Sequence, residues 1–332
     1  MTITASVVVP TYQRPELLNR CLAALAVQDF PTDRYEIIVV DDAASAETAR
    51  QVARWQRNSS ASIRYLPMCE VARHGPAAAR NCGWRGACGA IVAFTDDDCI
   101  PDLGWLRAGA TALEGAGSCA PSSLLAGGWG RTIVPIPLDP TDYERDAAGL
   151  ERAEAITANA FYRRDALEAV GGFDERFRAA WREDSDLFFS LLERRACVVP
   201  IPAAIVVHPV RAARWGGCLG QQRKSRYNAL LYKKHPRLYR QRIQSAPPWG
   251  YYATVAAGLL AVLGLARGDR RLALGAICSW AWQTGRFCSR RLAGTRHTTR
   301  HIAEMLVTSA LIPPLSIYWR LHGAIEFRVV FL

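Results

Sequence analysis

Three consecutive carboxylates, Asp96 to Asp98, follow the apolar run at residues 90–95. A second pair, Asp41 and Asp42, follows another apolar run. Each block repels itself, because like charges stand side by side. Asp is common in turns, so a solvated turn is the simpler interpretation of either block taken alone. Two acidic blocks at neighbouring strand ends favour a bound cation instead, and their oxygen ligands suit Mn²⁺ or Mg²⁺ bridging phosphate groups.

The elements that must position these residues alternate between two periods along the first hundred residues. Apolar runs typical of buried strands alternate with apolar residues at helical spacing, and this rhythm predicts a parallel sheet with right-handed crossovers. The expected strands are 6–9, 35–40, 62–66, 90–95 and, later, 204–210, and the expected helices are 17–25, 46–56 and 76–88. The segment from 102 to about 160 is less regular, and its elements stay unassigned.

The predicted sheet gathers the polar residues at one edge. Thr11, Tyr12 and Arg14 follow the first strand, as the aspartates follow the second and fourth strands. Ligands of open α/β sheets bind at the carboxyl ends of the strands. The dinucleotide fingerprint GxGxxG is missing there, because "PTYQRPE" contains no glycine, and the chain has no Walker motif GxxxxGK[ST]. A nucleoside diphosphate held by a divalent ion is the chemistry that remains.

Five segments in this order resemble the family 2 glycosyltransferases of GT-A fold. They are "VVVPTYQRPELLNRCLAAL", "IIVVDDAAS", "GPAAARNCGWRGACGAIVAFTDDDCIP", "TANAFYRRDALEAVGGFDERF" and "WREDSDLFFSLLERR". The resemblance covers about residues 3–240 and implies a Rossmann-like, mostly parallel sheet flanked by helices. It also implies that a sugar moves from a nucleotide-sugar donor to a hydroxyl acceptor with inversion, with Mn²⁺ or Mg²⁺ as cofactor.

The resemblance assigns roles to residues of this sequence. "WREDSDL" looks like the family's ED motif, which makes Asp184, beside Glu183, the catalytic base; an acidic helix N-terminus is the structural alternative, and both can hold. Asp98, Asp96 and His208 would hold the metal, although a lone His at a strand end is more often structural. The expected donor-binding residues are Pro10, Thr11, Tyr12, Arg14, Asp41, Asp42, Arg80, Asp96 and Asp97. The expected acceptor-binding residues are Trp181, Gly172 and Asp174.

The C-terminal part of the chain differs in charge and hydropathy. Residues 1–204 hold 21 Lys and Arg against 27 Asp and Glu, whereas residues 205–332 hold 20 against 3. Residues 249–266 carry no charge and are long enough to span a bilayer, 272–285 is shorter, and Pro313 and Pro314 interrupt 305–319. We therefore expect a glycosyltransferase domain at 1–243 and a helical, membrane-associated region at 244–332, with the catalytic domain cytoplasmic.

Several alternatives stay open for this part. The apolar segments could cross the bilayer, lie in its interface, or pack as helices onto the catalytic domain or a second copy. A basic nucleic-acid-binding protein is the rival from another class, but no recognised module appears, and we expect no nucleic acid partner. A GT-A-like protein that binds carbohydrate or nucleotide without catalysis is the milder rival.

We expect a glycan or lipid-linked acceptor, no signal peptide, and ten cysteines that are small buried residues of a reduced, cytosolic chain.

Overall fold

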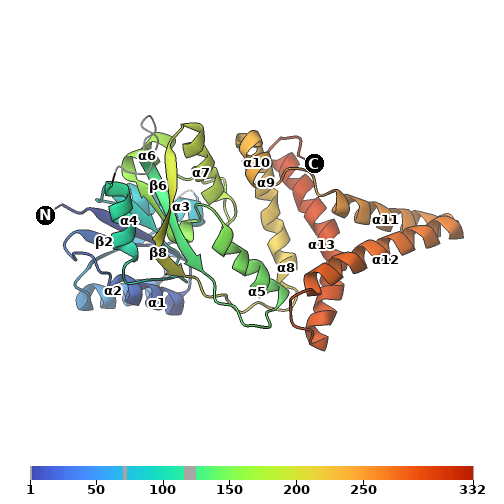
Figure 1. Ribbon diagram of the computed structural model, residues 1–332, viewed down its shortest axis with the longest axis horizontal. Helices are drawn as coiled ribbons and strands as arrows, with labels where there is room; N and C mark the ends of the chain where they lie inside the picture. The colour runs from blue at the N-terminus through green and yellow to red at the C-terminus, as the bar shows by residue number, and fades with distance from the viewer. Residues whose placement is uncertain (1, 70–72, 116–124, 332) are drawn as a thin grey trace. The chain divides into compact units, whose positions relative to one another are not determined.

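The computed structural model describes residues 2–69, 73–115 and 125–331. They form two compact units (Figure 1). The sheet unit comprises Met1–Pro135 and Gly149–Val210, and the helical unit comprises Ile136–Ala148 and Arg211–Leu332. This division by compactness differs from the expected one, a glycosyltransferase domain at 1–243 and a membrane-associated region at 244–332, which stays a prediction.

The sheet unit contains a single sheet of eight strands among the described residues, in the order β3-β2-β1-β4-β7-β6-β8-β5. The strands are β1 Ala5–Thr11, β2 Tyr35–Asp41, β3 Ser62–Pro67, β4 Ile91–Phe94, β5 Ile100–Pro101, β6 Leu125–Ile133, β7 Ala160–Arg163 and β8 Cys197–Val207. The first four strands are parallel, as predicted. The other half of the sheet is mixed, because β7 runs antiparallel to β4 and β6, and β5 runs antiparallel to β8. The outcome is the mixed, helix-flanked sheet of the expected fold class.

Helices cover both faces of this sheet (Figure 1). Val7 and Val9 of β1 pack on one face with α1, α2 and α4, whereas Val8 packs on the other face with α3, α6 and α7. Successive side chains of a strand point to opposite faces, so a strand buried on both sides is apolar at nearly every position. The helices are α1 Pro15–Leu25, α2 Ala46–Asn58, α3 Pro76–Arg85, α4 Trp105–Glu114, α6 Arg164–Val170 and α7 Glu183–Glu193, with the 3-10 turns η1 Ala148–Arg152 and η2 Thr157–Asn159.

The region from 102 to 160, unassigned from sequence, supplies α4 and β6. Strand β6 contains three glycines, which hide the apolar alternation of a strand. Their positions leave no room for a side chain: a Cβ at Gly128 would lie 2.6 Å from the carbonyl oxygen of Val199 on β8. Close packing of β6 against β8 therefore requires glycines, and the same glycines make β6 hard to recognise as a strand from the sequence.

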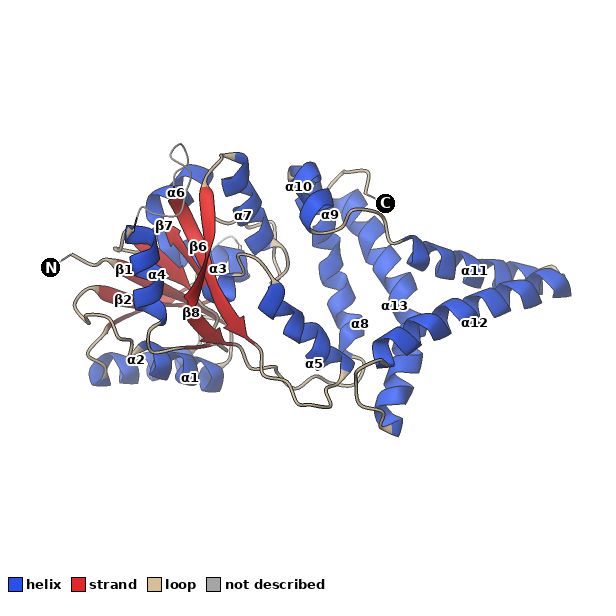
Figure 2. Cartoon of the chain, in the orientation of Figure 1, coloured by secondary structure: helices blue, strands red, loops and turns tan. Residues whose placement is uncertain are grey.

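The helical unit contains only helices and loops among its described residues (Figure 2). They are α5 Asp142–Ala147, α8 Gly217–Gln221, η3 Gln222–Arg226, α9 Tyr227–Lys234, α10 Pro236–Arg242, α11 Trp249–Ala266, α12 Arg270–Leu292 and α13 Thr299–Glu326. Helices α11 and α12 form an antiparallel hairpin (Figure 2), and Gly264 permits the close approach because its Cβ would lie 2.6 Å from the amide nitrogen of Ala273. Helix α5 belongs here because Arg291, itself buried, makes a 2.8 Å ion pair with Asp142.

Two apolar segments depart from the expected boundaries. The segment 272–285 lies inside the 23-residue α12, which also includes the arginine-rich residues that follow it. The segment 305–319 was expected to be interrupted at Pro313 and Pro314, and this expectation is wrong: α13 continues through both prolines for 28 residues. A proline removes a helix hydrogen bond, but packing can offset that loss. Here Pro313 is buried, and α13 packs against α12 and η3.

The cysteines are more varied than expected. Cys21, Cys99 and Cys288 are buried and free, in agreement with the prediction, but several other free cysteines are exposed. Cys197, at the start of β8, is disulfide-bonded. The expectation of ten small, buried, reduced residues is therefore wrong for part of the set.

Candidate active site

The loop after β1 is tied to the aspartate block. Thr11 Oγ1 donates a 2.8 Å hydrogen bond to Asp97 Oδ2, and Arg14 Nη1 pairs with Asp97 Oδ1 at 3.1 Å. Burial raises the pKa of the Asp97 carboxyl to about 6, while Arg14 and Thr11 oppose that rise. Asp97 thus holds Thr11 and Arg14, and with them the loop after β1, against the aspartate block. Pro10 precedes this contact within β1, and Tyr12, which follows it, is 53% exposed.

The pair at the end of β2 divides into two kinds of contact. Asp41 is fully buried and accepts hydrogen bonds from Ala43 N and Ser45 N, at 3.0 and 2.7 Å. Its carboxylate therefore holds the turn into α2. Asp42 instead contacts the start of α3: its Oδ2 accepts from Gly75 N at 2.9 Å, and its Oδ1 lies 2.7 Å from His74 Nδ1. Asp42 is the more accessible of the two expected donor contacts.

Arg80 joins the aspartate block to the start of α7. Its Nη2 lies 2.7 Å from Asp96 Oδ1, and its Nη1 lies 2.9 Å from Glu183 Oε1. The guanidinium is buried. Burial works against its charged form, but the charges of Asp96 and Glu183 raise its pKa overall. Residues far apart in sequence therefore meet at one edge of the sheet, on a single buried cation.

The ED pair begins α7, as both alternatives required. Glu183 is buried, and its Oε2 accepts a 2.7 Å hydrogen bond from Trp181 N. Burial raises the pKa of Glu183 to about 7; the neighbouring charge of Asp184 adds to the rise, and Arg80 opposes it. Asp184 is only partly buried and accepts from Ser185 N at 2.6 Å. Of the two carboxylates, Asp184 is the one that a ligand can reach, because it is only partly buried.

Asp98 and His208 come together from opposite parts of the chain. His208 follows β8 directly, and its Nε2 lies 3.7 Å from Asp98 Oδ1. Strand β5 causes this proximity, because it places Ile100 opposite Val207. His208 Nδ1 is buried and has no hydrogen-bond partner in the described part of the chain. Asp98, Cys99 and His208 each offer one atom that could bind a metal, and these three atoms all lie within 4.8 Å of one another.

This set fits a hard divalent cation. Carboxylate oxygen and imidazole nitrogen both ligate Mn²⁺, and carboxylates ligate Mg²⁺. The thiol of Cys99 is the poorer donor, because burial and the nearby aspartates raise its pKa well above the usual range and keep the proton on sulfur. Asp96, the other expected ligand, is turned toward Arg80. The structure thus groups two of the three expected metal residues.

The expected acceptor residues make different contacts from one another. Trp181 is 37% exposed, and the Arg182 guanidinium lies 4.9 Å from the centre of its ring. Gly172 (φ +75°) is needed for packing onto α3, since a Cβ there would lie 2.6 Å from Asn81 Oδ1. Asp174 is ion-paired with Arg176 at 2.6 Å. Trp181 is the most exposed of the three.

Three residues of the site were not predicted from sequence. Tyr65, on β3, donates a 2.8 Å hydrogen bond to Asp41, and burial raises its pKa. His74 contacts Asp42, and Cys99 lies in the group with His208. Tyr65 lies near the carboxyl end of a predicted strand, which was the available signal. His74 precedes the Gly-Pro that begins α3, but nothing in the sequence places that helix start beside β2.

Comparison with known proteins agrees with this geometry. The sequence model described as Glycosyl transferase family 2 matches residues 6–171, half of the chain. Glycosyltransferase AglE of Haloferax volcanii is 32% identical over 174 residues, which are 51% of this chain and 55% of that protein. The GalNAc(5)-diNAcBac-PP-undecaprenol beta-1,3-glucosyltransferase of Campylobacter jejuni is 37% identical over 93 residues, which are 28% of this chain and 29% of that protein. The chain spans about half, or less, of the length of these relatives.

A solved structure shows the same fold. The mannosyltransferase PcManGT from Pyrobaculum calidifontis, in complex with GDP-Man and Mn²⁺, matches with a TM-score of 0.59 and 20% identity over 95% of this chain and 88% of that one. At this identity, the likeness concerns the GT-A fold alone. The match over residues 6–171 places the chain in a family: this protein belongs to glycosyl transferase family 2.

Proposed function

We propose that this glycosyltransferase moves a hexose-type sugar from a nucleoside-diphosphate sugar to a hydroxyl of a glycan or lipid-linked acceptor, with inversion. The observation that carries the proposal is the Arg80 bridge, which links Asp96 of the aspartate block to Glu183 beside Asp184. It connects the strand-end edge where a donor diphosphate would lie to the helix start where a base would act. The proposed reaction needs the aspartate block and the Glu183–Asp184 pair close together, and Arg80 links the two.

Asp184 is the proposed general base. The acceptor oxygen attacks the anomeric carbon while the bond from that carbon to the diphosphate oxygen breaks, and Asp184 takes the hydroxyl proton. This carboxylate lies in the first turn of α7 and is only partly buried, so an acceptor hydroxyl can approach it. Glu183, buried against Arg80, is a positioning residue: it accepts the amide hydrogen bond of Trp181 and so orients the acceptor side.

Asp98 and His208 would hold the divalent ion, which, when bound, neutralises the charge that develops on the leaving diphosphate. The Mn²⁺ in the complex of the Pyrobaculum mannosyltransferase, which has the same fold, supports the use of a divalent ion. On the donor side, Asp42 and Tyr12 are the accessible residues, whereas Asp41, Asp97 and Arg80 hold the walls of the site through the contacts above.

Membrane association is the second part of the proposal. Two described helices of the helical unit, α11 and α13, are long and apolar enough to cross a bilayer. Of the most apolar 18-residue stretch of each helix, only 22% is buried in α11 and 33% in α13. The name of the Campylobacter relative describes a lipid-linked acceptor, which would also require a membrane surface. We therefore propose an envelope glycan pathway, a lipid-linked or membrane-proximal acceptor, and a catalytic sheet unit on the cytoplasmic side.

The test is a screen of nucleotide-sugars for thermal stabilisation and for slow donor hydrolysis, with and without Mn²⁺. We expect one donor class to stabilise the protein and to release nucleoside diphosphate only when the ion is present. A protein that binds sugars or nucleotides without catalysis would give stabilisation but no release. If no nucleotide-sugar had either effect, the proposal would be wrong.

A further inference from the structure

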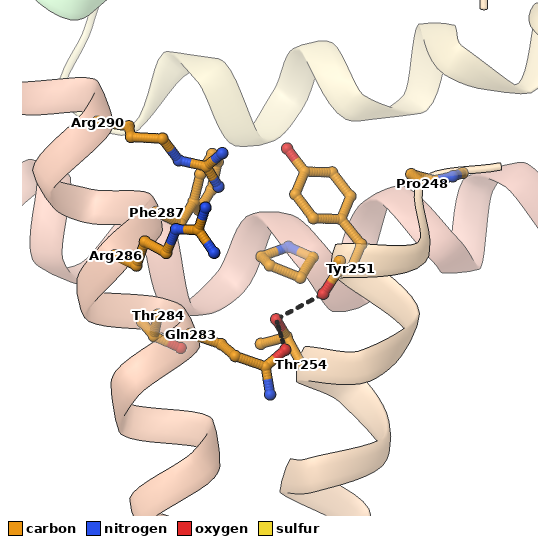
Figure 3. A pocket seen from close by; sticks show the side chains of 10 residues that line it. Pro248, Tyr251, Thr254, Gln283, Thr284, Arg286, Phe287 and Arg290 are labelled. Carbon is orange, nitrogen blue, oxygen red and sulfur yellow. Dashed lines mark hydrogen bonds between the residues drawn. The ribbon is translucent and has the colours of Figure 1, made fainter. Parts of the chain in front are cut away.

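A cavity of about 250 Å³ lies within the helical unit, among α11, α12 and α13. Its lining includes Tyr251 and Thr254 near the start of α11, and Arg286 and Arg290 near the end of α12 (Figure 3). It therefore lies at the open end of the hairpin, away from the turn that joins the two helices. At ~30 Å³ for each water, such a space would hold on the order of eight waters, enough for a small hydrated anion.

The cavity carries net positive charge. Arg286 and Arg290 stand four residues apart, on one face of α12, and both extend toward Tyr251 (Figure 3). No carboxylate of the described residues lies within ion-pair distance of either guanidinium. Arg291, the next residue along the helix, shows the contrast, because it is paired with Asp142 at 2.8 Å. The two lining arginines thus keep their charge available to a ligand.

Uncharged donors complete the lining. The hydroxyl of Thr284 is buried and makes no hydrogen bond within the described part of the chain. Thr254 Oγ1 is already engaged, since it donates to Gly250 O at 2.8 Å. A buried hydroxyl without a partner is costly, and a ligand oxygen in the cavity would satisfy it. Two guanidinium groups and a free hydroxyl are donors suited to phosphate oxygens.

The surface of the same hairpin is apolar away from the cavity. Leu259 and Val262 of α11 are 66% and 65% exposed, and Leu274 of α12 is 64% exposed. Charged groups follow at each end of this apolar stretch, the cavity at one end and Arg267 with Arg271 at the other. A bilayer has the same order, with a hydrocarbon layer between two layers of headgroups.

We propose that this cavity binds the phosphate of a membrane lipid headgroup, while the apolar face of the hairpin contacts the acyl chains. The inference rests on the membrane association in the proposed function and adds a specific ligand to it. A soluble phosphate would explain the arginines but not the exposed apolar residues beside them. A lipid that carries phosphate explains both.

The test uses the full-length chain in neutral detergent micelles, titrated with short-chain phosphatidic acid. Replacing both arginines (Arg286→Gln with Arg290→Gln) should weaken binding by at least about tenfold, because charge-assisted hydrogen bonds are lost. Thr284→Val, which keeps the shape and removes the hydroxyl, should weaken binding roughly threefold. The matched control, Arg267→Gln with Arg271→Gln, removes the same charge from the other end of the hairpin and should bind like the wild type.

Two further ligands show whether binding depends on the phosphate, on the acyl chains, or on both. Inorganic phosphate carries the headgroup chemistry without a lipid, and dihexanoylglycerol carries the lipid without phosphate; both should bind more weakly than phosphatidic acid. Equal binding of inorganic phosphate would overturn the lipid assignment. Equal losses in the double variant and in its control would overturn the site. Donor hydrolysis, measured on the same samples, reports on the sheet unit, so a failure of the proposed reaction is distinguishable from a failure of this site.

Discussion

In the sheet unit, the apolar side chains of β1 other than Pro10, and all those of β2, are fully buried, and charged residues at the strand ends are paired with one another. In the helical unit, α11 leaves Leu259 and Val262 exposed, and α12 leaves Arg286 and Arg290 unpaired among the described residues. Burial of apolar surface is a main source of stability in water, so exposed leucines on a long helix require another environment. The sheet unit pairs most of its strand-end charges internally and leaves a few polar groups for a ligand, whereas the helical unit leaves apolar surface and two arginines for a partner.

This comparison predicts that a change at the strand-end edge alters chemistry while a change in the hairpin alters attachment. The largest effect is expected at Asp184. Asp184→Asn keeps the size of the side chain but cannot accept the proton, so turnover should fall by roughly two to four orders of magnitude. Donor affinity should stay near the wild-type value, because the carboxylate acts on the acceptor. Steady-state kinetics together with donor titration measure both quantities.

Asp165→Asn is the matched control for this variant, since Asp165 lies on α6 in an exposed ion pair with Arg163. It should leave turnover unchanged. Near-normal turnover in Asp184→Asn would remove this carboxylate from the mechanism and make Glu183, beside it, the residue to test next.

The next effect concerns attachment. Leu259→Arg places a charge near the middle of α11, which costs about 2.5 to 3.5 kcal/mol within a bilayer. The fraction of the protein retained on carbonate-washed membranes should therefore fall, while donor binding by the sheet unit persists. Val27→Arg changes an equally exposed apolar residue of the sheet unit, 64% exposed, and should not alter retention. Equal retention of both variants would mean that α11 does not contact lipid.

A smaller effect is expected in the pH dependence of stability. Burial raises the pKa of Glu183 to about 7 in the folded chain, above the ordinary value of a glutamate side chain. The folded state therefore binds the proton more tightly than the unfolded state, and stability from this group is present at low pH and lost as pH rises through 7. Relative to Glu183→Gln, the wild type should lose on the order of 1 to 3 kcal/mol between about pH 4.5 and 7.

Urea unfolding of the two proteins at pH 5 and pH 8 measures this difference. The sign is the decisive result. If the wild type gained stability over the Gln variant with rising pH, Arg80 would dominate over burial, and Glu183 would be ionised throughout.

The parts of the fold predicted from sequence are those with strong local signals. Val7 to Val9 are buried on both faces of the sheet and therefore form a continuous apolar run, so β1 was predictable, as was β2. Strand β6 was missed because its close packing requires glycines. The helix through Pro313 was also missed, since its continuity depends on packing by residues distant in sequence.

The site follows the same division. The aspartate blocks were predicted at strand ends, because a parallel sheet brings those ends to one edge. The contact between Asp98 and His208 depends on the two-residue strand β5, which is too short to leave a periodic signal. The Arg80 bridge is similar, since it joins residues 103 positions apart. Local patterns identified the groups, and long-range pairing determines which of them meet.

The most direct test of the account is donor binding by the sheet unit at Asp98. Calorimetric titration with the preferred nucleotide-sugar, with and without Mn²⁺, compares the full-length wild type with Asp98→Ala and with Asp33→Ala, which removes an exposed aspartate between α1 and β2. We predict that the wild type and Asp33→Ala bind donor only with the ion, and that Asp98→Ala loses this dependence and its affinity. Unchanged affinity and unchanged metal requirement in Asp98→Ala would contradict the account.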